Sequence, residues 1–432
     1  MKNLILGAIK DYGWYDIEPF FRSWRENCPH ADIALFADNI LPWTLSQLKT
    51  FPNVTIISAP CNDTLVVDAR WTFYRQYLEE NAERYSGVFL TDIRDVIFQG
   101  DPFSKGELYP SYFEYATEDV SIESTPASNA LWIRKFFGDS AYHALKDKSV
   151  ICAGTICGTV TAILIFLKKM EELLARSTFW GADQASMNYL VHNHLLPLKN
   201  LVESNTFSGD ILTLSGLPDA EVSEGNVLSR NRSVPSVVHQ YDRHKELVRL
   251  IDQTYRSPAP PAMPDAESIE DMLDILDFFW YNGKESLVLS QLNALAEKSK
   301  KEPEWQIPDE RLLRMLKTHM ELPAGSLTSS FIEQTLQYLM TRARNIDILQ
   351  IEAFWKIITA YREQQKTLYK PFERFVGNCT RQASELMESD AEYGYALQYL
   401  ERLSTIDYPL DSEYHARTAK LRELLSKGTV QK

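Results

Sequence analysis

Positive charge is in deficit along this chain. Its 432 residues include 45 Lys and Arg against 59 Asp and Glu, which gives a formal net charge of −14. Binding to nucleic acid or docking on anionic lipid needs basic surfaces. We therefore expect no nucleic-acid partner and no electrostatic attachment to a membrane.

Cysteine is also scarce, and its spacing is irregular. The chain has five cysteines, without a CxxC pair or nearby paired histidines, at Cys28, Cys61, Cys152, Cys157 and Cys379. An odd, scattered set indicates reduced thiols and therefore a cytoplasmic protein. A metal or redox role for Cys152 and Cys157 is the alternative, but small buried cysteines near glycine are the interpretation we favour. All five are assigned packing roles.

Long uninterrupted apolar runs are missing too. The apolar stretch within residues 1–9 is too short for a signal peptide and lacks a small-residue cleavage site, so it predicts a first strand. Residues 150–167 carry no charge, but glycines and threonines break them into shorter pieces. We expect a buried strand, a glycine turn and a helix there, and no transmembrane segment.

Two domains are expected from the length. Up to about residue 245, short apolar runs alternate with amphipathic stretches, which is typical of βα units on a mostly parallel sheet. The first domain, an α/β fold with a Rossmann-like sheet, is predicted to span residues 1–256. Its expected strands lie at residues 4–9, 32–36 and 54–58, and its expected helices at 17–25 and 68–84.

A proline-rich stretch at residues 257–264 marks the predicted linker, because dense proline cannot continue a helix or a strand. Beyond it no strand pattern occurs, and residues 265–432 are predicted to form an all-α domain. Positioning of a long acceptor, docking of a protein partner and oligomerisation are open roles for this half. Amphipathic helices are expected at residues 269–281, 286–298, 309–320, 329–344 and 347–363.

The segment Val88–Phe103 interrupts an apolar run with two carboxylates, Asp92 and Asp95, and an arginine, Arg94. Such runs are typical of strands buried on both faces, and open α/β sheets bind ligands at the carboxyl ends of their strands. The acids are therefore candidates for a metal–phosphate site, and Arg94 either binds a phosphate or pairs with an acid. An ordinary turn is the alternative.

The second motif, Val237–His244, places an imidazole and a guanidinium after an apolar entry. His239 can complete the coordination of a manganese-like ion, and Arg243 can clamp a departing phosphate. The alternative for His239 is an ordinary hydrogen-bonded core residue.

The third motif, Phe179–Leu190, begins a helix with an acid and an amide in its first turn. Asp183 is either a helix cap or a group that binds acceptor hydroxyls, with Gln184 beside the anomeric carbon. In the preceding segment, Gly154 and Thr155 lie where the backbone could approach a sugar closely.

Taken together, these motifs resemble those of GT-A type glycosyltransferases, over roughly the first 245 residues. The nearest pattern is that of bacterial and viral polysaccharide transferases with an L-T-D-x-R-D-V-x-F-Q-x-D-P-F block and an H-Q-Y-D-R-H block, matched at 90–103 and 239–244. This chain has D-x-x-D where the usual pattern is D-x-D. The division of labour between Asp92 and Asp95 therefore stays open.

The resemblance implies a UDP-, GDP- or dTDP-sugar as donor, a saccharide as acceptor, and Mn²⁺ or Mg²⁺ held by Asp92, Asp95 and His239. Arg70 resembles the basic residue that supports the diphosphate in such enzymes, the alternative being an exposed helical arginine. The donor-binding residues implied in this way are Ala8, Ile9, Tyr12, Asp38, Arg70, Asp92, Arg94, Gly154 and Thr155.

The implied reaction is glycosyl transfer in polysaccharide biosynthesis, with Arg243 stabilising charge on the leaving diphosphate. The Asp183–Gln184 pair resembles that of retaining family-8 transferases, in which the leaving phosphate accepts the acceptor's proton. If the enzyme inverts instead, Asp183 is the candidate base. A nucleotidyltransferase is an alternative, although residues 7–13 lack the Gly-rich basic loop of that class. The other alternative is a non-catalytic scaffold that recruits a partner through its helical half.

Overall fold

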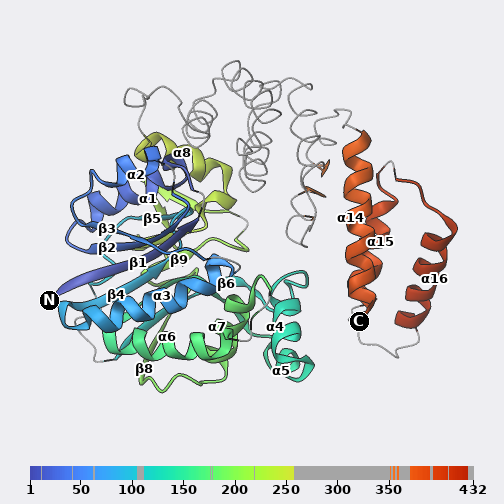
Figure 1. Ribbon diagram of the computed structural model, residues 1–432, viewed down its shortest axis with the longest axis horizontal. Coiled ribbons are helices and arrows are strands. Elements are labelled where there is room, and N and C mark those ends of the chain that lie inside the picture. The colour runs from blue at the N-terminus through green and yellow to red at the C-terminus, as the bar shows by residue number, and fades with distance from the viewer. Residues whose placement is uncertain are drawn as a thin grey trace, which may run out of the picture. The chain divides into compact units, whose positions relative to one another are not determined.

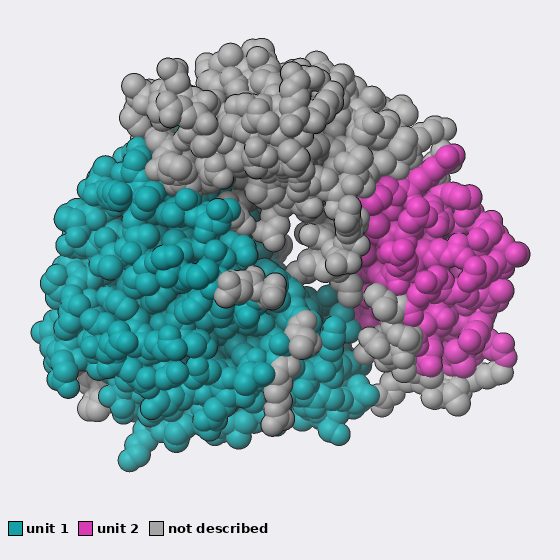
Figure 2. Space-filling view, in the orientation of Figure 1, with its two compact units in different colours: residues 1–266 teal, residues 267–432 magenta. Residues whose placement is uncertain are grey.

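The computed structural model divides into two compact units, Met1–Ala266 and Glu267–Lys432 (Figure 2). The predicted linker and most of the five predicted helices between residues 269 and 363 lie outside the described residues, so the domain boundaries stay predictions. The structure describes residues 1–256 except 11, 41, 62–63, 105–110, 176, 178 and 218, and then residues 351, 354–355, 358–359, 370–389, 393–406 and 408–426.

A seven-stranded sheet forms the centre of the first unit (Figure 1). All its strands run in one direction except β7, which is antiparallel to both β4 and β6. The order across the sheet is β3 (Val54–Ser58), β2 (Asp32–Asp38), β1 (Lys2–Lys10), β4 (Tyr85–Thr91), β7 (Ser149–Thr159), β6 (Tyr112–Ser121) and β8 (Asn200–Ser204).

Helices cover both faces of this sheet. Figure 1 shows α3 and α6 on one side of it and α1, α2 and α8 on the other. The helices of this unit are α1 (Trp14–Asn27), α2 (Pro42–Leu48), α3 (Val66–Asn81), α4 (Asn129–Phe137), α5 (Asp139–Leu145), α6 (Val160–Leu174), α7 (Ala182–His192) and α8 (Lys245–Tyr255), with 3₁₀ turns η1 (Ala82–Arg84) and η3 (Tyr241–Arg243).

A smaller sheet carries the second sequence motif. Strand β12 (Val237–His239) pairs antiparallel with β5 (Val96–Phe98) and parallel with β9 (Ile211–Thr213). A separate hairpin joins β10 (Glu221–Ser223) to β11 (Asn226–Leu228). Because β5 directly follows the acids of the first motif, the small sheet brings two distant parts of the sequence together.

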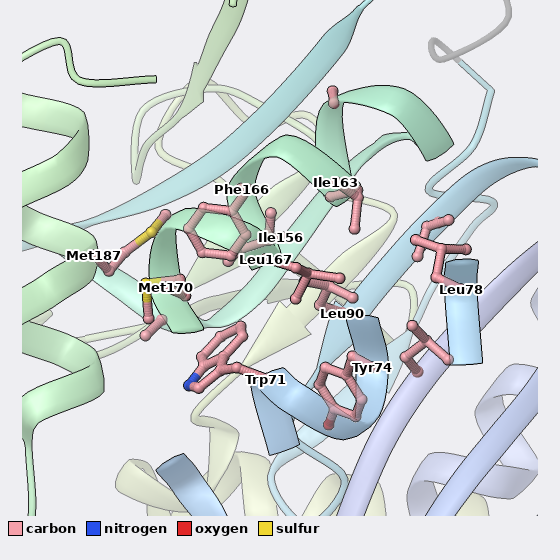
Figure 3. Packing of buried hydrophobic residues seen from close by; sticks show 14 of the residues in the cluster. Trp71, Tyr74, Leu78, Leu90, Ile156, Ile163, Phe166, Leu167, Met170 and Met187 are labelled. Atoms are coloured by element: carbon pink, nitrogen blue, oxygen red, sulfur yellow. The ribbon is translucent and has the colours of Figure 1, made fainter. Parts of the chain in front are cut away.

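The aromatic stripe of α3 packs as a core element. Trp71 and Tyr74 are 1% exposed, and the Trp71 ring meets Phe166 of α6 edge-on, with 5.6 Å between ring centroids (Figure 3). Burial of aromatic rings of this size contributes a large part of a core's stability. This packing fixes the axis of α3 and, with it, the position of Arg70, one residue before Trp71.

Residues 150–167 form a strand and a helix, as predicted, but the expected glycine turn between them is wrong. Strand β7 continues through both glycines to Thr159, whose Oγ1 accepts a hydrogen bond from the Ala162 N–H and caps α6. Because a side-chain cap satisfies an orphan amide at the helix start, the chain passes from strand to helix without a glycine turn.

Strand β7 also has a bulge, at Ala153, Gly154 and Thr155. Tyr115 of β6 pairs with Ile156, but the next residue of β6, Ala116, pairs with Cys152. Ala153, Gly154 and Thr155 therefore have no partner in β6. The bulge stays attached on its other side, because the Asp92 N–H donates to the Gly154 carbonyl at 2.7 Å. Bulges of this kind re-aim side chains beside functional sites.

Most of the described residues of the second unit lie in the helices α14 (Lys370–Ser389), α15 (Tyr393–Leu403) and α16 (Ser412–Ser426), and a turn follows α15. Arg417 of α16 bonds to Glu388 of α14 at 2.8 Å from its Nε atom. The predicted fold class, a mostly parallel α/β domain followed by helices, is confirmed for the described part of the chain. No helix among the described residues is both long and apolar enough to span a bilayer.

Candidate functional site

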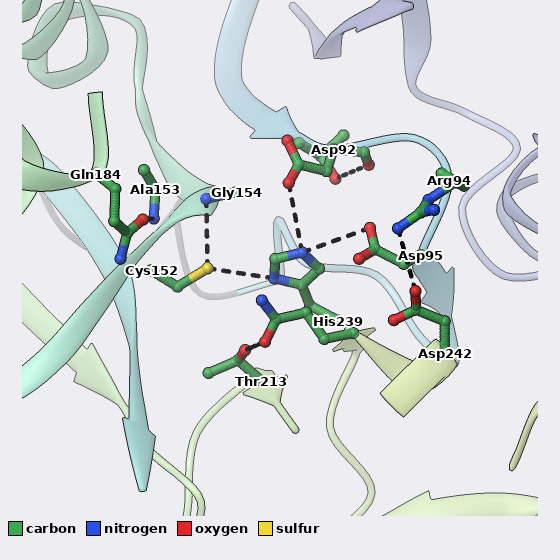
Figure 4. Close-up of polar contacts among 12 residues, drawn as sticks. Asp92, Arg94, Asp95, Cys152, Ala153, Gly154, Gln184, Thr213, His239 and Asp242 are labelled. Carbon is green, nitrogen blue, oxygen red and sulfur yellow. Dashed lines mark hydrogen bonds and ion pairs between the residues drawn. The ribbon is translucent and has the colours of Figure 1, made fainter. Parts of the chain in front are cut away.

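Asp92, Asp95 and His239 converge at the carboxyl end of β4 (Figure 4). Asp92 directly follows β4 and Asp95 directly precedes β5, while His239 pairs with Val96 at the end of β12. This register places the His239 Nε2 atom 3.5 Å from the Asp92 Oδ2 and 3.6 Å from the Asp95 Oδ1. The first two sequence motifs therefore form one site.

The His239 imidazole is 1% exposed, and its Nε2 atom is buried without a hydrogen-bond partner. An orphaned buried nitrogen between two carboxylates is expensive unless something positively charged lies there. One imidazole nitrogen and two carboxylate oxygens suit Mn²⁺ or Mg²⁺, with positions left for phosphate oxygens or water. The residues therefore fit a divalent cation, and in its absence a protonated His239 ring can form ion pairs with both carboxylates.

The charges of this cluster reinforce one another. Burial on its own would lower the pKa of His239, but Cys152 and the carboxylates outweigh it and raise that pKa well above 6.5. Burial would raise the pKa of Asp95, yet the His239 charge holds it far below the usual range. Arg70 likewise overcomes burial and lowers the pKa of Asp92. Both carboxylates are ionised, as cation ligands must be, and the His239 ring would release its extra proton on binding a cation.

Gly154 is the residue that lets these groups meet. A Cβ atom built on Gly154 would lie 2.5 Å from both the Asp92 Oδ2 and the His239 Cε1. Such contacts are far inside van der Waals distance, so any side chain here would push the ligands apart. The sequence pointed to backbone approaching a sugar at this glycine; the structure shows it packed against the acid–imidazole cluster.

Arg70 of α3 joins the third motif to the first. It is 7% exposed, its Nη1 lies 2.5 Å from the Asp92 Oδ1, and its Nη2 lies 3.0 Å from the Asp183 Oδ2. The alternative of an exposed helical arginine is therefore wrong, because the guanidinium neutralises two acids at once.

Asp183 and Gln184 begin α7 with their side chains already engaged. The Asp183 Oδ1 accepts a hydrogen bond from the Gln184 backbone N–H at 2.8 Å, in addition to the bond from Arg70. The Gln184 amide donates to the Ile151 carbonyl at 2.7 Å and accepts from the Ala153 N–H at 2.9 Å. The bond from Ala153 lies in the β7 bulge, where β6 offers no partner.

Arg94 points to an acid of the second motif. Its Nη2 lies 3.1 Å from the Asp242 Oδ2, and the Arg243 Nε lies 3.6 Å from the other oxygen of the same carboxylate. The Arg243 side chain is 44% exposed. Arg94 therefore pairs with an acid in this structure, but that acid, Asp242, comes from the distant second motif and not from beside Arg94 in the sequence.

The remaining candidate residues also lie near the carboxyl ends of the strands. Ala8 and Ile9 are near the carboxyl end of β1, which is parallel to and between β2 and β4. Asp38 ends β2 and accepts from the Cys61 N–H at 3.2 Å, and Tyr12 follows β1. Thr155 is fully buried and pairs with Thr91.

Cys152, which the sequence analysis assigned to packing, lies beside the cluster. Its Sγ lies 3.4 Å from the His239 Nδ1, so a pure packing role for this cysteine is wrong. A second group of donors, Cys28, His30 and Asp101, also lies close together. There the Asp101 carboxylate already accepts from the Phe103 N–H and contacts both other side chains, so nothing is left unpaired that points to an ion.

Comparison with models of protein families gives no match, and comparison with curated proteins gives none either. Among solved structures, an active-site mutant of LgtC overlays with a TM-score of 0.40 and 12% identity, covering 60% of this chain and 98% of that one. The galactosyltransferase LgtC in complex with donor and acceptor sugar analogs overlays with a TM-score of 0.36 and 13% identity, covering 60% of this chain and 98% of that one. The apo form of the glycosyltransferase GlyE from Streptococcus pneumoniae TIGR4 overlays with a TM-score of 0.31 and 17% identity, covering 47% of this chain and 45% of that one.

Proposed function

We propose that this chain is a metal-dependent glycosyltransferase that moves a sugar from a nucleoside-diphosphate donor to a hydroxyl of a saccharide acceptor. The observation that carries the proposal is the convergence of the buried His239 Nε2 atom, which has no hydrogen bond, with the carboxylates of Asp92 and Asp95 at 3.5 and 3.6 Å. This donor set lies where open α/β sheets bind nucleotides, at the carboxyl ends of parallel strands. The motif resemblance supports the same activity.

A divalent cation, Mn²⁺ or Mg²⁺, held by Asp92, Asp95 and His239 would neutralise the diphosphate as the glycosidic bond breaks. The protein's own contribution is positive charge placed around that position. Arg243 stands on the exposed side of the cluster, 3.6 Å from Asp242, where it can reach a departing phosphate. Arg70 holds Asp92 in place from the buried side.

The donor's nucleoside is proposed to lie across the ends of β1 and β2. Ala8, Ile9 and Tyr12 would contact the base, and Asp38 would accept hydrogen bonds from the ribose. These positions adjoin Asp92, because β4 lies directly beside β1 in the sheet. Arg94 and Thr155 complete the donor site on the β4 and β7 side.

Retention of configuration is the stereochemistry that we propose. An inverting enzyme needs a carboxylate ready to accept the proton of the acceptor hydroxyl. Asp183, the candidate base, already receives bonds at both oxygens, from Arg70 and from the Gln184 N–H. With that acid engaged, the leaving phosphate is the proposed proton acceptor.

The cytoplasm is the compartment that we propose, since all five cysteines are buried and free. Polysaccharide biosynthesis is the proposed role, with the helical half as the part that positions the acceptor or binds a protein partner.

The test is release of nucleoside diphosphate from a panel of UDP-, GDP- and dTDP-sugars with Mn²⁺ present. Wild-type protein should release it from one of them, and Asp95→Ala should abolish the signal. Asp32→Ala is the matched control, because Asp32 lies at the amino end of β2, away from the carboxyl ends of the strands, and pairs with Lys2. If no donor is turned over and no nucleotide shifts the melting temperature, the proposal is wrong.

A further inference from the structure

The second nitrogen of His239 contacts a sulfur atom. Cys152 is 3% exposed, and its Sγ lies 3.4 Å from the Nδ1 atom, on the side of the ring away from the carboxylates (Figure 4). Among the described residues, this is the hydrogen-bond partner that the structure gives to Nδ1. The usual partner of a metal-ligating histidine is a carboxylate, a backbone carbonyl or water.

The chemistry of the imidazole decides which atom is the donor. For Nε2 to offer its lone pair to a cation, the ring's single proton must be on Nδ1. The Nδ1–H then needs an acceptor, since a buried N–H left unpaired is costly. Only a sulfur that accepts this bond holds the ring in the tautomer that can ligate.

The sulfur is already arranged as an acceptor. The Gly154 backbone N–H also points at the Cys152 Sγ, at 3.4 Å. Gly154 lies in the bulge of β7 and against Asp92, so one sulfur joins the bulge to the imidazole. A side chain that bonds to both would set the distance between the strand and the ring.

Cys157 shows what a packing cysteine looks like on the same strand. It is 1% exposed, and its Sγ donates to the Pro102 carbonyl at 3.4 Å, so its sulfur acts as a donor to backbone. Cys152 and Cys157 thus share strand, burial and chemistry but differ in what they contact. This makes Cys157 a matched control.

We propose that Cys152 is a positioning residue that accepts the Nδ1–H of His239 and so presents Nε2 to the cation. The inference rests on the proposed metal-dependent function and names a residue outside the ligand set. It predicts that the sulfur affects metal affinity through His239 and by no other route.

The experiment measures Mn²⁺ binding by isothermal titration calorimetry in the full-length protein. Cys152→Ala should raise the dissociation constant for Mn²⁺ by about 10- to 100-fold, the range found when such supporting partners are removed. Cys152→Ser should lose less, because a hydroxyl oxygen can also accept the bond, and Cys157→Ala should bind as wild type does. In a His239→Ala background, adding Cys152→Ala should change affinity less than about twofold, since residues that act as a unit are not additive.

Melting temperatures show whether each variant is folded, and Cys152→Val, which also lacks an acceptor, serves in place of Cys152→Ala if the latter is not. The proposal is overturned if that variant binds Mn²⁺ as tightly as Cys157→Ala, or if its loss adds in full to that of His239→Ala. Wild-type protein that binds no Mn²⁺ would remove the metal site itself, together with this inference. Wild-type binding with unaffected Cys152 variants would remove only the inference.

Discussion

The Asp92 Oδ2 atom lies 3.5 Å from the Nε2 atom of His239, although Asp92 follows a strand of the large sheet and His239 ends a strand of the small one. The approach is possible because the nearest backbone, at Gly154, carries no side chain. A Cβ at that position would be 2.5 Å from both residues. The geometry of the cluster therefore depends on one glycine in the β7 bulge.

Gly154→Ala should separate the ligands while leaving the fold largely intact. We expect Mn²⁺ affinity and donor turnover to fall roughly tenfold or more, as happens when ligand geometry is disturbed. The matched control is Gly158→Ala on the same strand, where a Cβ would lie 2.8 Å from the Tyr112 carbonyl and away from the cluster. That variant should lose melting temperature but keep Mn²⁺ affinity. Equal Mn²⁺ affinity in the two variants would contradict the role of Gly154.

Arg70→Met should destabilise the protein strongly. It removes the charge between Asp92 and Asp183 and leaves the buried Asp183 carboxylate without its cation, a change that costs on the order of 3–5 kcal/mol. Urea unfolding measures the loss. Adding Asp183→Asn should recover part of the lost stability, because the carboxylate left without its cation is then replaced by a neutral amide.

The control for Arg70 is an arginine on the surface. Arg84 bonds to Asn81 at 2.8 Å in an exposed position, so Arg84→Met should cost less than about 1 kcal/mol. If both arginine variants lose similar stability, the bridge between the two acids does not contribute as we infer.

Gln184→Ala should lower stability and Mn²⁺ affinity together. Its amide satisfies the Ala153 N–H and bonds to the Ile151 carbonyl, so its removal should cost roughly 1–3 kcal/mol and release the segment that carries Gly154. Gln99→Ala removes a similar pair of bonds to Val227, in the neighbourhood of the smaller sheet, and should lose stability without losing Mn²⁺ affinity. A Gln184→Ala variant with wild-type stability and a lower kcat would instead favour direct contact with the sugar.

Asp68 should make the protein less stable as the pH rises. Burial raises its pKa to about 6 from 3.8, even though Ser177 donates a hydrogen bond to it. Between these values the folded protein holds a proton that the unfolded chain has released, so the free energy of unfolding falls with rising pH. Urea unfolding at pH 4 and pH 7 should show a smaller fall in Asp68→Asn. The exposed Asp219→Asn should follow wild type; an Asp68→Asn variant that does the same would refute the assignment.

Much of the first unit could be predicted because its signals are local. The run Tyr85–Thr91 forms β4, as expected of a continuous apolar stretch in a buried strand. The acids follow at its carboxyl end, which is where open α/β sheets bind ligands. The same holds for β12 and His239. The glycine turn after residue 153 could not be excluded locally, because a bulged strand and a strand–turn pair have the same composition.

The sequence by itself determined the alternation of strands and helices and the residue types able to hold a cation. Only the tertiary structure decided which of them meet. Arg70 is buried because acids from β4 and α7 arrive on either side of it, and Cys152 faces His239 because β7 bulges beside β12's end. Periodicity is a property of neighbours in sequence, whereas charge pairing and hydrogen-bond direction depend on the order and register of strands far apart in the chain.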